Sequence, residues 1–150
     1  MKHNLILKVV SKFLIPLIFL FALYVQFHGD FGPGGGFQAG VIFSAGIILY
    51  ALVFGVDSAK KVIPLHILRV LASLGVLIYA GTGVASLLLG GNYLEYGVLA
   101  STQLAGQHIG IIVIELGVGI TVMAVMLIMF FAFAERGRPI EDVKDKEANN

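Results

Sequence analysis

Four long apolar segments constrain the fold more than any other feature of this sequence. They run over residues 5–27, 37–56, 66–89 and 108–134. A helix needs roughly 20 apolar residues to cross the hydrocarbon core of a bilayer, and each segment reaches that length. Because the core offers no water to backbone polar groups, each segment must satisfy those groups internally, as a helix does. The sequence therefore predicts an all-α membrane protein with four transmembrane helices.

The composition supports one membrane domain rather than a soluble domain with an anchor. Hydrophobic residues make up 58% of the chain and charged residues 13%, and the mean hydropathy is +0.95. The first apolar segment contains Pro16, where we expect a kink, and ends in bulky residues, so we interpret it as a retained span rather than a cleaved signal peptide. We expect a four-helix transmembrane domain over residues 1–134 and a charged cytoplasmic tail over residues 135–150.

The basic residues predict the orientation of the chain in the membrane. The connections at residues 28–36 and 90–107 contain no Lys or Arg. Basic residues collect on the cytoplasmic side of membrane proteins, so both termini are predicted to be cytoplasmic, in the cell's inner (plasma) membrane. All ten basic residues obey this pattern: Lys2, Lys8, Lys12, Lys60, Lys61, Arg69, Arg136, Arg138, Lys144 and Lys146.

Glu115 is the main candidate for chemistry, because it lies inside the fourth apolar segment. An ionisable group at that depth is costly and is a functional hypothesis by default. His108 precedes it by seven residues, which places both on one helical face about 10 Å apart along the axis. Two interpretations stay open for Glu115: a place on an ion or proton path, or a carboxyl group satisfied by a neighbouring helix or subunit. His108 is either part of that path or an interface residue.

A glycine-rich connection precedes the second apolar segment. It includes Pro33, Gly34, Gly35, Gly36 and Phe37, with Gly40 one turn further on. Free backbone amides here could form a positive helix end, or the missing side chains could let another helix approach the backbone closely. We favour close packing.

Each of three further polar residues has either a functional role or an ordinary structural one. His28 and Asp30 flank the glycine-rich connection and could pass protons or cations at an outer mouth, or they could be an ordinary solvated pair. Arg69 lies near the predicted cytoplasmic start of the third span. It could extend its charge to the membrane surface, or it could pair with an acidic group of another subunit.

Small residues at fourfold spacing predict where helices pack closely in the membrane. Such pairs and triplets occur in three spans: Gly36, Gly40 and Ser44; Gly81 and Ala85; Gly106 and Gly110. We expect each set to face another helix. Large apolar residues elsewhere would face lipid or partner subunits.

Motifs for catalysis are lacking in the sequence, so we expect no enzyme activity, cofactor or metal site. Residues 34–39 match a dinucleotide-binding pattern, but that pattern requires a preceding strand and a soluble β-α-β unit. The chain has no cysteine, and its four histidines are too scattered along the sequence for a local metal site.

The segment from Pro33 to Phe37, followed by Gly40, resembles the P-G-G-G-F signature of the MnhB family, the small membrane subunits of Mrp-type (Mnh-type) sodium/proton antiporters. The resemblance extends over about residues 10–135. It implies a small accessory subunit that packs against larger subunits resembling the proton-pumping subunits of respiratory complex I. The implied partners are the other membrane subunits, the lipid bilayer, and Na+ and H+ as transported ions.

Two alternatives follow from the same resemblance. The segment before His28 and Gly29 contains no basic residue, unlike many bacterial members. The parent complex could therefore be an ion-pumping, membrane-bound, hydrogenase-like redox complex that contains a homologous subunit. The other alternative is a purely structural scaffold subunit with no ion path.

Overall fold

The computed structural model describes residues 2–29 and 32–136. Over these ranges the chain is helical and contains no strand. Four helices are long and apolar enough to cross a membrane, as predicted: α1 (Lys2–His28), α2 (Gly36–Phe54), α4 (Leu65–Leu88) and α5 (Gln103–Arg136). The first two residues of the predicted tail, 135–150, belong to α5, and residues 137–150 lie outside the described residues.

Two of the three connections between spans contain short helices that the apolar pattern did not predict. Helix α3 (Val56–Val62) joins α2 to α4, and the 3-10 helix η1 (Tyr96–Leu99) lies between α4 and α5. Helix α5 also begins five residues earlier than predicted. The Thr102 hydroxyl accepts a hydrogen bond from the Ala105 backbone N–H at 3.3 Å, which is the arrangement of a helix N-cap. Helix α1 runs through Pro16 without interruption.

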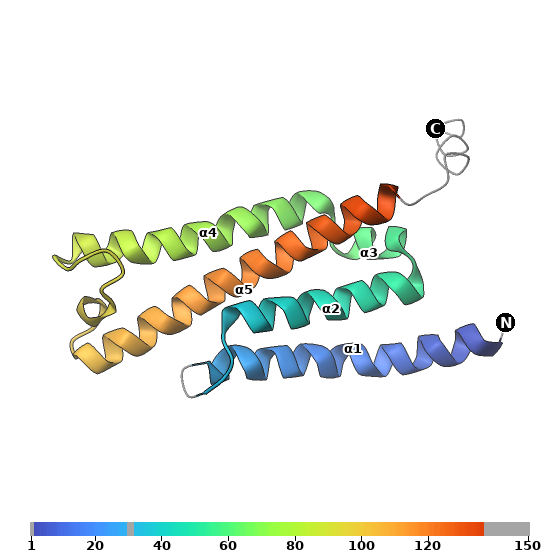
Figure 1. Cartoon of the computed structure of the whole chain (residues 1–150), viewed down its shortest axis with the longest axis horizontal. Helices are drawn as coiled ribbons and strands as arrows, with labels where there is room; N and C mark the ends of the chain where they lie inside the picture. The colour runs from blue at the N-terminus through green and yellow to red at the C-terminus, as the bar shows by residue number, and fades with distance from the viewer. Residues whose placement is uncertain (1, 30–31, 137–150) are drawn as a thin grey trace.

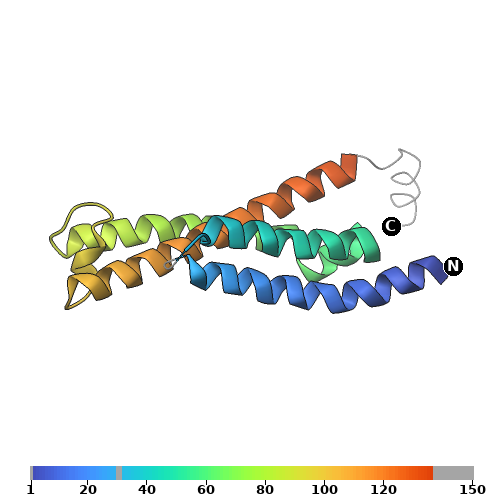
Figure 2. The same ribbon diagram turned by 60° about the horizontal axis from the view of Figure 1, so that its bottom comes forward.

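The long helices lie side by side in the order α4, α5, α2, α1 (Figure 1). Helix α5 packs on both α4 and α2, whereas α1 packs mainly on α2. The start of α1 and the end of α5 lie at one end of the molecule, and the connection with η1 lies at the other (Figure 1). Figure 2 shows α5 crossing the other helices obliquely. Much apolar surface remains exposed on α1, α4 and α5, where it is available to lipid or to other subunits.

The apolar core lies toward the end where α1 begins and α5 ends. Its largest fully buried side chains are Leu68 from α4 and Leu127 and Phe131 from α5. Ala59 of α3 is buried in the same cluster, so α3 is anchored against α5. Lys60 of α3 also forms an ion pair with Glu135 near the end of α5.

Glycines bring the helices together in the middle of the molecule. On α2, Gly36, Gly40 and Ser44 are buried as predicted. A Cβ added at Gly40 would lie 2.6 Å from the Gly119 carbonyl oxygen and 2.9 Å from Val122 Cβ, so this stripe faces α5. Between α4 and α5, Gly75 packs directly on the backbone of Gly117.

The prediction for Gly81 was wrong. A Cβ added there would have no neighbour within 4 Å, and the residue is exposed. The face of α4 that meets α5 contains Leu68, Gly75 and Thr82 instead. Gly81 is one residue from Thr82, which rotates it by about 100° off this face. Gly106 and Gly110 also differ from expectation, because their nearest neighbours belong to the connection between α4 and α5 rather than to another long helix.

That connection folds back onto the helices through two tyrosines. The Tyr93 ring packs on Gly83 of α4, and Tyr96 packs on Gly106 and Gly110 of α5. No side chain other than hydrogen would fit at Gly83 or Gly110 without moving these rings. The connection therefore closes this end of the α4–α5 pair.

Candidate functional site

The glycine-rich connection reverses the chain tightly between α1 and α2. The Gly35 N–H donates to the Val25 carbonyl oxygen at 3.1 Å, and the Gly32 N–H donates to the His28 carbonyl oxygen at 3.1 Å. Gly35 precedes α2 and has φ 114°, a conformation that favours glycine. These bonds hold the first turn of α2 against the last turns of α1.

Glu115 of α5 lies against this connection. A Cβ added at Gly29 would lie 2.6 Å from Glu115 Oε1 and 2.8 Å from Oε2, and one added at Gly35 would lie 3.0 Å from Oε1. At Gly36 a Cβ would overlap the Glu115 backbone carbonyl. The three glycines therefore leave the space that the Glu115 side chain and backbone occupy.

The N-terminus of α2 supplies a favourable field for this carboxylate. Gly35 has no capping side chain, and the first turn of α2 contains no acidic residue of its own. The first backbone N–H groups of a helix lack partners within the helix and carry partial positive charge. Glu115 lies beside this end of α2, so α5 supplies the acidic side chain that the first turn of α2 lacks. The positive end of α2 would therefore favour a negative charge at this position.

Two glutamines contribute further polar groups. Gln26 of α1 is only 7% exposed. Its Oε1 would lie 2.8 Å from a Cβ added at Gly119, one turn beyond Glu115 on α5. Gln38 of α2 places its Oε1 3.8 Å from a Cβ added at Gly35. Neither was predicted from the sequence, although an amide near the end of an apolar span, as Gln26 is, was the available signal.

The site lies about a third of the way along α5 rather than at the end of the molecule. Glu115 follows Gln103 by twelve residues, or about 18 Å of helix, so it is deeper than the two turns expected. The α1–α2 pair stops partway along α5, while α4 and α5 continue past it (Figure 1). The glycine-rich connection is therefore recessed relative to the connection that contains η1.

The other predicted residues occupy different parts of the structure. His28 is half-buried at the end of α1, where its ring stacks on Tyr24 with centroids 5.2 Å apart. His108 is half-buried on α5, about 10 Å from Glu115 along the axis. Arg69 is exposed on α4, and Asp30 lies outside the described residues. Pro33 and Phe37 are exposed. Between them, Gly35 and Gly36 pack on Glu115 of α5, whereas Gly34 packs on Val25 and Gly29.

A metal site is not formed by the residues that the structure describes, since no three His, Asp or Glu side chains gather closely enough to hold an ion. What the arrangement offers is one membrane-embedded carboxylate, a helix N-terminus and nearby amide groups. Such a set can bind and release a proton, or contact a passing cation, without a covalent step. The fold is that of a polytopic helical membrane protein.

Comparison with known proteins assigns the family. Residues 6–128 match the family described as a domain related to the MnhB subunit of Na+/H+ antiporter. Proteins named "Putative antiporter subunit mnhB2" from Staphylococcus aureus strains Newman and COL are each 31% identical over 138 residues, covering 89% of this chain and 97% of each relative. The chain belongs to the MnhB family. It is therefore a membrane component of a multisubunit antiporter, which agrees with the resemblance noted in the sequence.

Proposed function

We propose that this chain is a subunit of a Na+/H+ antiporter in which Glu115 lies on the path of the proton or the cation. The observation that carries the proposal is the enclosure of the Glu115 carboxylate by the backbone of Gly29 and Gly35, beside the start of α2. A carboxylate held in this way can exist in charged and protonated forms within the membrane, because the helix end stabilises the charge.

The α1–α2 pair stops partway along α5 (Figure 1), and the glycine-rich connection at its end contacts Glu115. At about 10 Å along the helix axis, His108 is too far for a direct hydrogen bond to Glu115, so a relay between them would run through water.

The same proposal gives the exposed apolar surfaces a role. Helix α1 exposes large apolar side chains along most of its length, and α4 and α5 do so on their outer faces. In the proposed complex these faces pack against the larger subunits and lipid. Arg69, exposed on α4, is then available for a charge on a neighbouring subunit.

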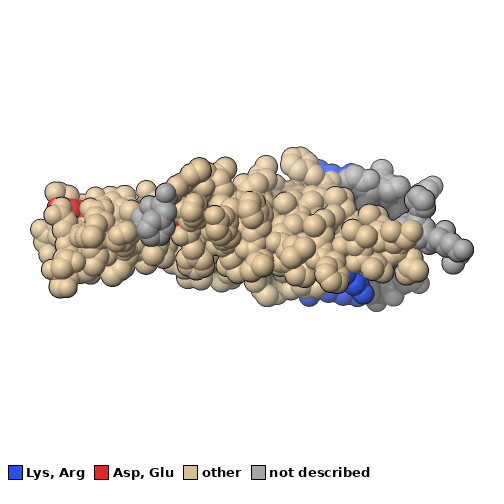
Figure 3. All heavy atoms as spheres, turned by 90° about the horizontal axis from the view of Figure 1, so that it is seen from below, with Lys and Arg blue, Asp and Glu red and all other residues tan. Residues whose placement is uncertain are grey.

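We also infer that both termini are cytoplasmic and that the chain works in the plasma membrane. On the face shown in Figure 3, all visible Lys and Arg atoms lie toward the end where α1 begins and α5 ends, whereas the visible acidic atoms lie at the other end and partway along the molecule. This separation supports the orientation predicted by the distribution of basic residues. The glycine-rich connection would then open toward the outside.

Exchange assays in everted membrane vesicles test the role of Glu115. The Glu115→Gln variant keeps the shape of the side chain but removes its charge, so it should assemble normally and lose most Na+-dependent proton movement. The Glu115→Asp variant should retain part of the activity. Glu95→Gln, which removes an exposed carboxylate in the connection between α4 and α5, is the matched control and should be active. Full exchange by an assembled Glu115→Gln complex would leave only the scaffold role.

Purification of the tagged chain in mild detergent tests the identity of the complex. We expect large membrane subunits resembling those of complex I, without redox proteins. Nickel–iron or iron–sulfur subunits in the same complex would instead assign the chain to an ion-pumping redox complex. Recovery of the chain without partners would contradict both assignments.

A further inference from the structure

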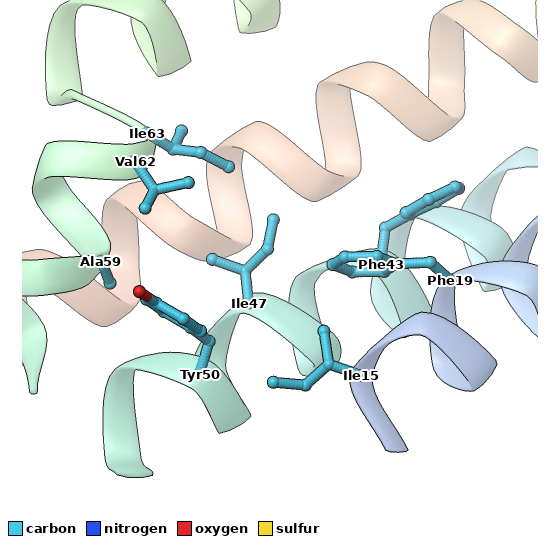
Figure 4. A pocket seen from close by; sticks show the side chains of 8 residues that line it. All are labelled: Ile15, Phe19, Phe43, Ile47, Tyr50, Ala59, Val62 and Ile63. Carbon is cyan, nitrogen blue, oxygen red and sulfur yellow. The ribbon is translucent and has the colours of Figure 1, made fainter. Parts of the chain in front are cut away.

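A recess opens between α1, α2 and α3 (Figure 4), toward the end of the molecule where α3 lies. Its volume is about 300 Å3. It is lined by side chains from all three helices: Ile15, Phe19, Phe43, Ile47, Tyr50, Ala59, Val62 and Ile63. No part of the candidate ion site lies among these residues.

The lining is almost wholly apolar. Tyr50 carries the one side-chain oxygen among the lining residues (Figure 4). Phe19 and Phe43 form an aromatic wall, with ring centroids 5.7 Å apart. Since one water occupies about 30 Å3 and a methylene group is of similar size, the recess has room for roughly ten methylene groups. Its size and lining therefore suit a segment of hydrocarbon chain.

Helix α3 keeps the recess from closing because it is attached on its other side. Ala59 is buried in the core cluster with Leu127 and Phe131 of α5. Lys60 forms its ion pair with Glu135 and lies 5.6 Å from the centroid of the Phe131 ring. These contacts hold α3 toward α5, away from α1.

Apolar contact alone does not select an occupant inside a membrane, because lipid tails are as apolar as the recess. Selection must come from a headgroup. Two lysines flank the recess along the chain: Lys12 precedes Ile15 by almost one turn of α1, and Lys61 directly precedes Val62 on α3. Both are exposed. Basic groups beside a gap between membrane helices are suited to a lipid phosphate.

We propose that the recess binds one acyl chain of an anionic phospholipid from the leaflet at this end of the molecule, with its phosphate contacting Lys12 and Lys61. The lipid would join α1 to α3 and complete the packing of the α1–α2 pair. Zwitterionic phospholipids would bind more weakly, because the positive amine of the headgroup is repelled by the two lysines.

Mass spectrometry of the intact complex, extracted in mild detergent, tests this proposal. Val62→Phe narrows the recess and should lower the amount of bound anionic phospholipid. Val70→Phe is the matched control, because Val70 on α4 is also 64% exposed but does not line the recess. Replacing Lys12 and Lys61 by Gln should weaken binding by about fivefold for each lysine. Equal lipid retention by Val62→Phe and Val70→Phe would overturn the proposal.

Photocrosslinking separates lipid from protein as the occupant. The full-length chain in native membranes would carry benzoylphenylalanine in place of Phe43, on the wall of the recess. We expect adducts whose mass corresponds to an anionic phospholipid, in excess of that lipid's share of the membrane. Adducts with another protein of the complex, or with phospholipids in bulk proportion, would contradict the proposal.

Discussion

Gly36 is the position where the structure leaves the least room for a side chain. It is the first residue of α2, and a Cβ there would overlap the backbone carbonyl of Glu115. A flexible side chain could rotate away from such a contact, but a backbone carbonyl inside α5 cannot. Gly36→Ala must therefore separate α2 from α5 at the level of the candidate site.

The size of the effect follows from the cost of overpacking. Extra methyl groups in a packed interior cost about 1–3 kcal/mol, and the rigid neighbour places Gly36→Ala toward the upper end. For a chain of this length, that corresponds to a fall in the unfolding midpoint of roughly 2–12 °C. Gly81→Ala is the control, because Gly81 has no neighbour within 4 Å of an added Cβ. It should gain up to about 1 kcal/mol from helix propensity.

Size-exclusion chromatography of the fluorescently tagged complex, after heating over a range of temperatures, measures both variants. Gly36→Ala should lose the intact peak at lower temperature than the wild type, and Gly81→Ala at the same or a higher temperature. If Gly36→Ala were as stable as Gly81→Ala, the close contact between Gly36 and Glu115 would be refuted.

Three further predictions concern the connections. A cysteine replacing Gly32 should react with an impermeant thiol reagent added outside intact cells, and reaction from the inside alone would reverse the proposed orientation. Lys60→Gln should lower the free energy of unfolding by less than about 1 kcal/mol, since the Glu135 side chain is 56% exposed. The double variant Lys60→Glu, Glu135→Lys should restore the stability, and an equal loss in that variant would argue against the ion pair. Burial raises the pKa of Tyr96 above its usual 10.0. The neutral Tyr96 side chain therefore stabilises the fold fully below pH 10.0, and this stabilisation is lost as the pH rises through the raised pKa. Because Tyr96→Phe cannot ionise, the connection in this variant should resist proteolysis to a higher pH than in the wild type; cleavage of both proteins at the same pH would contradict this.

The sequence was sufficient to predict the helices that cross the membrane. Hydropathy identifies four spans, because backbone groups in hydrocarbon leave few alternatives to a helix. It also singled out Glu115 and the glycines at 34–36, since a charge and a bare backbone are both unusual in a membrane span. The stripe of Gly36, Gly40 and Ser44 predicted a packing face, and α2 packs on α5 through it.

The relations between elements could not be predicted in the same way. Glu115 and Gly36 are 79 residues apart, and no local pattern shows that they touch. Their contact depends on how far the α1–α2 pair slides along α5, which side-chain packing decides and hydropathy does not. The same reasoning explains Gly81, which fits a small-residue spacing but is rotated off the contact face. Helix α3 was missed because its seven residues are too few for an apolar period to be recognised.

Infrared difference spectroscopy of the purified complex tests most directly whether Glu115 lies on the path of the proton or the cation, because either a change in its protonation or a contact with the cation alters its carboxyl bands. Adding Na+ should produce a carboxyl C=O band, positive or negative, that is present in the wild type and absent in Glu115→Gln. The band should persist in the Glu95→Gln control. An identical difference spectrum in Glu115→Gln and the wild type would contradict the claim that this carboxyl group takes part in ion exchange.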